Sequence, residues 1–170
     1  MTADQERQER FDRLVRYHSL RYRGEKFKSF LGGGTDGEVW KSCNDTAMKV
    51  FQREAGYCNE RDVYLRLAEY GLIRKIDDFW VPRLIDYDDE LMIVEMSLMQ
   101  DPPYIIDFAK VYFDFPKEFP DDVLEDAETQ GRERFEHNWP AVKSLLATLE
   151  TFGIFYADPN RGNITFPDMP

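Results

Sequence analysis

The sequence predicts an α+β protein with an antiparallel, strand-rich first half and a mainly helical second half. Three observations lead to this fold class. Short runs of apolar residues bounded by turn residues fill residues 25–52 and again 82–96, which is typical of strands. Between them, the apolar residues of 54–70 have helical spacing and predict one helix that ends at Gly71. A second helical stripe covers residues 139–152.

The composition excludes several classes of protein. Hydrophobic residues make up 42% and aromatic residues 15% of the 170 positions, as in a globular protein. The net charge is −11, so we expect no general nucleic-acid binding, because that affinity comes largely from lysine and arginine. The polar N-terminus has no signal peptide, and the longest apolar run, residues 91–99, is too short for a membrane span. Cys43 and Cys58 are isolated and lack the spacing of a zinc site. Two isolated cysteines favour a reducing, cytoplasmic compartment, and a single disulfide between them is the open alternative.

In chain order, residues 4–22 carry apolar residues at helical spacing among many charges and predict an amphipathic helix, with His18 packed on its apolar stripe. We therefore expect an N-terminal helix over 1–24, a β-rich small lobe over 25–97 and a reduced large lobe over 98–170. Together these parts would form one compact bilobal domain.

A glycine-rich turn joins the first two predicted strands. The pattern is Gly32-x-Gly34-x-x-Gly37-x-Val39, and Lys49 follows in the segment Ala47-Met48-Lys49. Glycines at these positions let backbone N–H groups approach phosphate oxygens, and the lysine adds a positive charge. The same glycine spacing opens dinucleotide-binding folds, but there the turn must lead into a helix. Here strands flank the turn and favour a nucleotide-binding hairpin.

The second half of the chain contains two predicted helices and, after them, another motif. Residues 111–137 are acidic and aromatic and show no evident chemistry; we expect a connecting loop and then a helix from Asp121. Asn138 is expected to cap the next helix, which Gly153 ends. Directly afterwards comes Asp158-Pro-Asn-Arg-Gly-Asn163, an aspartate five positions before an asparagine. This is the spacing of a catalytic base and a metal-binding amide in phosphoryl transfer.

Over residues 25–166 these motifs, in this order, resemble the protein-kinase-like superfamily, and the form Asp-Pro-Asn-Arg-Gly-Asn is nearer the atypical bacterial and small-molecule kinases. The resemblance implies a protein-kinase-like fold, with ATP and Mg²⁺ bound between the small lobe and the large lobe. Asp158 would be the catalytic base, with Lys49 and Glu60 forming the ion pair that extends the lysine toward the phosphates. The nucleotide would be bound by Gly32, Gly33, Gly34, Gly37, Val39, Ala47 and Lys49, and by the main chain at Glu95 and Met96.

The sequence departs from the family pattern around the metal. Tyr156 and Ala157 stand where histidine and arginine are expected, and Asn160 stands where a lysine is usual, leaving Arg161 as the candidate phosphate-binding cation. No Asp-Phe-Gly segment follows Asn163, the first implied metal ligand.

One earlier stretch offers the missing acid. Residues 104–110 read as a strand leading to Asp107-Phe-Ala, before the catalytic loop instead of after it. The hypothesis is a permuted order in which 104–107 pairs with 163–166 and presents Asp107 as the second metal ligand. A purely structural strand is the alternative for this stretch, and Asp168 is the alternative acid.

Two functions follow from the resemblance. The first is an ATP- and Mg²⁺-dependent phosphotransferase acting on an unknown protein or small-molecule acceptor. The alternative is a pseudokinase that binds nucleotide or partner proteins without catalysis, which the altered Tyr156-Ala157 pair favours. An α+β domain without a ligand is the third interpretation.

Overall fold

A computed structural model describes residues 2–72 and 74–168, and within it the chain divides into two compact units. The first unit contains the chain up to Tyr64 together with Arg83–Leu98, and the second contains Leu65–Pro82 and the chain from Met99 onward. The chain therefore leaves the first unit, enters the second and returns. Both units combine helices with sheets that are antiparallel except for the pair β5 and β8, which confirms the predicted α+β class.

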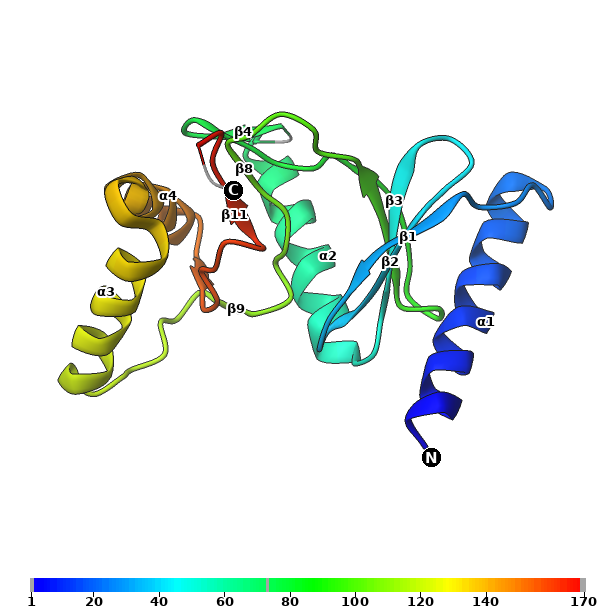
Figure 1. Cartoon of the computed structure of the whole chain (residues 1–170), viewed down its shortest axis with the longest axis horizontal. Helices are drawn as coiled ribbons and strands as arrows, with labels where there is room; N and C mark the ends of the chain where they lie inside the picture. The colour runs from blue at the N-terminus through cyan, green and yellow to red at the C-terminus, as the bar shows by residue number, and fades with distance from the viewer. Residues whose placement is uncertain (1, 73, 169–170) are drawn as a thin grey trace. The chain divides into compact units, whose positions relative to one another are not determined.

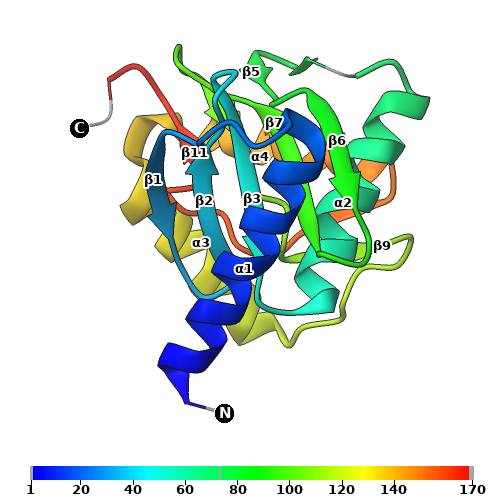
Figure 2. The same cartoon turned by 90° about the vertical axis from the view of Figure 1, so that its right-hand side faces the viewer.

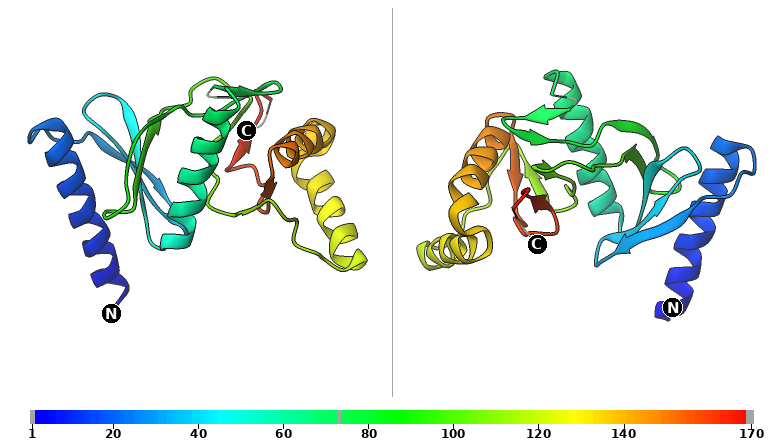
Figure 3. Two further views of the ribbon diagram at one scale, coloured as in Figure 1. Left: turned by 180° about the vertical axis from the view of Figure 1, so that it is seen from behind. Right: turned by 45° about the horizontal axis from the view of Figure 1, so that its top comes forward.

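The first unit is built on a five-stranded sheet. The sheet has the order β1-β2-β3-β7-β6, and each neighbouring pair is antiparallel. Figure 2 shows α1 lying across one face of this sheet, and Figure 3 shows the first part of α2 on the opposite face. The elements are α1 (Ala3–Tyr22), β1 (Ser29–Gly33), β2 (Gly37–Lys41), β3 (Thr46–Phe51), α2 (Glu54–Glu69), β6 (Leu84–Asp88) and β7 (Ile93–Ser97).

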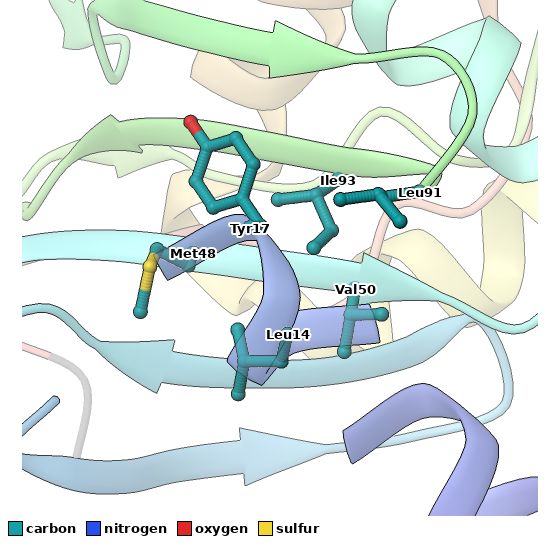
Figure 4. Close-up of a cluster of buried hydrophobic side chains, with 6 residues drawn as sticks. All are labelled: Leu14, Tyr17, Met48, Val50, Leu91 and Ile93. Carbon is teal, nitrogen blue, oxygen red and sulfur yellow. The ribbon is translucent and has the colours of Figure 1, made fainter. Parts of the chain in front are cut away.

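The two faces of the sheet carry different side chains. Successive side chains of β3 point to opposite faces, so Met48 and Val50 face α1 while Lys49 faces the other way. Figure 4 shows the α1-facing cluster. Its members, all buried, are Leu14, Tyr17, Met48, Val50, Leu91 and Ile93. The face that carries Lys49 is thus separate from the apolar core beneath α1.

A buried carboxylate also fastens α1 to β7. Glu95 is 0% exposed, accepts a hydrogen bond from the Tyr17 hydroxyl at 2.9 Å and pairs with Arg21 Nε at 2.6 Å. Tyr22 and Thr46 donate to it as well. Burial, followed by the negative charge of Glu95, raises the pKa of Tyr17 far above its ordinary value, so its hydroxyl stays a donor. The predicted amphipathic helix is confirmed. The spacing of its apolar residues did not indicate the hydrogen bonds and the ion pair that fix it to Glu95.

The second unit has smaller sheets and a helical pair. One sheet has the order β11-β8-β5-β4, and β10 pairs with β9 in another. In Figure 1 the chain runs from α3 (yellow) through α4 (orange) to β11 (red). The elements are β4 (Lys75–Ile76), β5 (Phe79–Trp80), β8 (Tyr104–Ile105), β9 (Val111–Phe113), α3 (Asp121–Phe135), the 3₁₀ helix η1 (Glu136–Asn138), α4 (Trp139–Thr151), β10 (Ile154–Tyr156) and β11 (Ile164–Thr165).

Helix α4 is the core helix that its apolar stripe predicts, since Val142, Leu145 and Leu149 are all 0% exposed. The predicted cap by Asn138 is wrong. Asn138 has helical backbone angles because η1 leads directly into α4, and its side chain makes no capping hydrogen bond. Its amide instead donates to Asp168 at 3.1 Å, which holds residue 168 against the start of α4.

None of the helices in the part of the chain that the structure describes is both long enough and apolar enough to cross a membrane.

Candidate functional site

The glycine-rich turn connects β1 to β2, and its glycines differ in what the fold requires of them. Gly34 N–H donates to the Gly37 carbonyl at 3.0 Å and closes the turn. A Cβ on Gly37 would collide with the carbonyl oxygen of Val50, so the close approach of β3 explains this glycine. A Cβ on Gly32 or Gly34 would meet no atom within 4 Å. The packing of β3 therefore excludes a side chain at position 37, whereas a small side chain would fit at positions 32 and 34.

Gly33 is tighter than these two, since a Cβ there would lie 3.3 Å from Glu38 Cγ. Its backbone pairs with that of Glu38 at the end of the β1–β2 ladder.

Lys49 lies at the centre of the sheet face opposite α1. It pairs with Val39 of β2 on one side and with Val94 of β7 on the other. Its ammonium lies 2.6 Å from Glu60 Oε2, and the two side chains are only 7% and 0% exposed. The ring of Phe51 lies 4.7 Å from the same ammonium. The ion pair expected from the sequence is thus present, and both charges are removed from water.

The remaining residues expected near the nucleotide base lie along the same strands. Ala47 is buried on β3 and pairs with Met96 of β7, and the Tyr64 hydroxyl donates to Met96 Sδ at 3.3 Å. Glu95 and Met96 are flanked by β3 on one side and β6 on the other. The Glu95 side chain points to the α1 face, opposite Lys49. The main-chain contact of Glu95 and Met96 with adenine stays a prediction.

In the second unit, two loops face each other and are joined at both ends. Residues 106–110, here the first loop, connect β8 to β9, and residues 157–163, the second loop, connect β10 to β11. Strand β8 pairs antiparallel with β11, and β9 pairs antiparallel with β10. Beyond these pairs, Ile106 N–H donates to the Asn163 carbonyl and Ala157 N–H to the Lys110 carbonyl, both at 3.0 Å. The strand pairing that the permuted order requires is therefore present.

Side chains tie the two loops together. The Tyr156 hydroxyl donates to the Asp107 carbonyl at 2.6 Å, and the rings of Tyr156 and Phe108 meet edge to face at 6.0 Å. Phe108 is 0% exposed. Tyr156, which stands where the resemblance expects histidine, thus holds the backbone of the acid that was expected to complete the metal site.

The oxygen donors on these loops suit a magnesium ion, which prefers carboxylate and amide oxygens. Asn163 Nδ2 donates to the Asp158 carbonyl at 3.2 Å, which fixes the amide of Asn163 to the second loop. Asn160 Oδ1 accepts from the N–H groups of Gly162 and Asn163 and fixes the turn. On the first loop, Asp107 Oδ1 accepts from Ala109 N–H at 2.9 Å. The donor types on the two facing loops therefore fit the implied metal.

The other candidates from the sequence have different partners. Asp168 accepts hydrogen bonds from Asn138 and lies 2.7 Å from His137 Nε2, so it belongs to the helix junction. Arg161, the cation expected to bind phosphate, pairs with Glu136 at 3.0 Å and also donates to the Arg134 carbonyl. Both residues stabilise the surroundings of the second loop.

The candidate base has a cationic partner that sequence reasoning missed. Lys110 Nζ of the first loop lies 2.8 Å from Asp158 Oδ2 of the second. Burial alone would raise the pKa of Asp158, but hydrogen bonds from Lys110 and Asn160 outweigh it and hold the pKa below the ordinary value. Asp158 is therefore a carboxylate at neutral pH. Lys110 and Asp158 are 48 positions apart, and only the pairing of the two loops brings them together.

Comparison with known proteins gives little guidance. No protein-family model and no curated protein matches the chain. One solved structure that aligns with it is the ternary complex of streptomycin, ATP and APH(2″)-IIa, at 12% identity and a TM-score of 0.40. The alignment covers 54% of this chain and 29% of that protein. So distant a likeness is compatible with a kinase-like fold but assigns neither fold nor activity, and the candidate site stands on its own geometry.

Proposed function

We propose that the protein is an ATP- and Mg²⁺-dependent phosphotransferase of the kinase-like type, acting on a protein or small-molecule acceptor. The observation that carries the proposal is the pair of loops joined at both ends. It brings the segment of Asp107 against the segment of Asp158 and Asn163, although the chain order is permuted relative to the resemblance. A base and two oxygen ligands are the groups that phosphoryl transfer requires besides charge on the phosphates.

Each half of the proposed machinery lies within one unit. In the first unit, the open space at Gly32 and Gly34 would let the phosphates approach the backbone of the turn closely, and Glu60 would keep Lys49 directed toward them. In the second unit, Asp158 would orient and deprotonate the acceptor hydroxyl. Asn163 and Asp107 would hold the magnesium ion. The bound ion supplies positive charge that neutralises the phosphates.

The contacts of Tyr156 bear on the pseudokinase alternative. In sequence, the replacement of histidine by Tyr156 favours loss of catalysis. In the structure, the Tyr156 hydroxyl binds the Asp107 carbonyl and its ring packs on Phe108. Because the replacement still fastens the two loops, it supports a working site, and we favour the enzyme.

The test is a pair of measurements on the whole chain. Thermal unfolding is followed with ATP alone, with MgCl₂ alone and with both, and phosphate release from ATP is then measured over time. We expect ATP with Mg²⁺ to raise the melting temperature and slow hydrolysis to accompany it. Stabilisation without hydrolysis or acceptor labelling would favour the pseudokinase. No stabilisation by any nucleotide would contradict both nucleotide-binding proposals.

The glycines offer a more specific prediction. We expect Gly34→Ala to change the free energy of unfolding by less than about 0.5 kcal/mol, since the new methyl group meets open space. The same change should weaken ATP binding roughly tenfold, because the new methyl group would keep the phosphates from their closest approach to the turn. Chemical denaturation and titration with ATP and Mg²⁺ measure the two quantities.

Gly37→Ala is the matched control. Its methyl group would strike the Val50 carbonyl, so we expect a loss of about 1–3 kcal/mol of stability. If Gly34→Ala instead destabilises the fold as much as Gly37→Ala, or leaves ATP binding unchanged, the turn has no role at the phosphates.

A further inference from the structure

The contact between Lys110 and Asp158 joins the two loops at the candidate base. Lys110 follows the buried Phe108-Ala109 pair, and its carbonyl accepts from Ala157 N–H at 3.0 Å, so its backbone is fixed opposite the base. Its side chain is 48% exposed and that of Asp158 32% exposed, with 2.8 Å between Nζ and Oδ2. The pair is thus accessible to a substrate and has a defined backbone on both sides.

We propose that Lys110 is a positioning residue for Asp158: from the opposite loop, it holds the base as an oriented carboxylate. This inference rests on the proposed phosphotransferase function and adds a residue to it. The second loop itself offers no cation for this task. Asn160 stands at the position where a lysine is usual, and the guanidinium of Arg161 is held by Glu136 and the Arg134 carbonyl.

The other charged neighbour of Asp158 comes from α3. Arg134 donates to the Pro159 carbonyl at 3.2 Å and to Gln130, and its charge also lowers the pKa of Asp158, but less than the contacts of Lys110 and Asn160. Arg134 therefore supports the loop backbone next to the base. Lys110 is the cation in direct contact with the carboxylate.

Removing this cation has a definite structural consequence. Lys110 holds Asp158 Oδ2 from the first loop at 2.8 Å. Without that contact the carboxylate can turn to other rotamers, so a smaller fraction of the molecules presents it to the acceptor hydroxyl in the reactive orientation. The rate of the chemical step should then fall, whereas the binding of ATP should change little.

The experiment compares Lys110→Met with Lys110→Arg and with the control Lys117→Met. Lys117 belongs to the same unit but lies in the next connection, between β9 and α3, and its ammonium lies over the rings of Tyr112 and Phe119, at 5.8 and 5.3 Å. For each variant, kcat and the KM for ATP are determined from phosphate release. The carboxyl ¹³C chemical shift of Asp158 is recorded at neutral pH, with its resonance assigned as the one lost in Asp158→Asn. Far-UV circular dichroism checks the fold.

We expect Lys110→Met to lower kcat roughly tenfold to a hundredfold, with little change in the KM for ATP, and to change the Asp158 carboxyl shift, because the ammonium at 2.8 Å is gone. Lys110→Arg should restore most of the activity, and Lys117→Met should behave as wild type. An unchanged kcat or an unchanged Asp158 resonance in folded Lys110→Met would overturn the inference. A changed Asp158 resonance in a protein whose wild type shows no turnover would support the contact of Lys110 with Asp158 while contradicting the proposed function.

Discussion

Asp158→Asn should lower the rate of phosphoryl transfer by about 10²–10⁴-fold while ATP binding with Mg²⁺ persists, because an amide cannot accept the acceptor's proton. The substitution keeps the shape of the side chain, so Asn163 can still donate to the carbonyl of residue 158. The structural loss is one half-exposed ion pair with Lys110, which contributes little to stability. Single-turnover phosphate release and ATP titration separate the two quantities.

Asp114→Asn is the matched control for this change. Asp114 also pairs with a cation at 2.7 Å, in its case Arg66, and it belongs to the same unit but lies outside the two facing loops. We expect this variant to keep wild-type turnover. Equal losses in the two variants would show that charge loss or destabilisation, and not removal of a base, explains the effect. Full activity in Asp158→Asn would contradict the assignment of Asp158 as the catalytic base.

Glu60→Ala should destabilise the first unit by about 3–5 kcal/mol, since it removes the buried carboxylate that contacts the Lys49 ammonium at 2.6 Å. The two groups are almost wholly shielded from water, so the lysine cannot be resolvated without disturbing β3. We also expect loss of ATP binding. Urea denaturation measures the first effect, and it should far exceed that of Arg16→Ala, which breaks an exposed pair with Glu90.

A double variant separates structure from function at the same site. In Lys49→Met with Glu60→Leu, both charges are replaced by apolar groups of similar size, so most of the stability lost in Glu60→Ala should return. ATP stabilisation should not return, because the cation for the phosphates is gone. Recovery of ATP stabilisation in the double variant would show that Lys49 serves only the fold.

Local patterns in the sequence were sufficient for much of the fold. Apolar runs bounded by turn residues marked the strands around Lys49, and helical spacing marked α2 and α4. The pairing of β8 with β11 also followed from the sequence, because the resemblance required an acid at the second loop and one apolar run ended in a suitable one. These features depend on residues close in the chain or on a motif with fixed spacing.

Contacts between distant residues could not be predicted in this way. Nothing near Lys110 in sequence indicates that it meets Asp158, since the contact exists only once two separate strand pairs have formed. The anchoring of α1 by Glu95 is similar, because a single acid in an apolar strand gives no hint of its partners. The Asn138 cap failed for a related reason: the cap pattern is local, but the 3₁₀ helix η1 leads into α4 without a break.

The interrupted course of the first unit has a consequence for synthesis of the chain. Tyr17 and Glu95 are 78 positions apart, and β7 lies between β3 and β6 in the sheet. When β1, β2 and β3 have left the ribosome, the edge of β3 that β7 later covers is still unpaired, and the cluster around Met48 and Val50 still lacks Leu91 and Ile93. An apolar, unpaired strand edge invites pairing with other chains. The nascent protein is therefore most prone to aggregate before residues 93–97 have emerged, and chaperones that bind extended apolar segments should act at that stage.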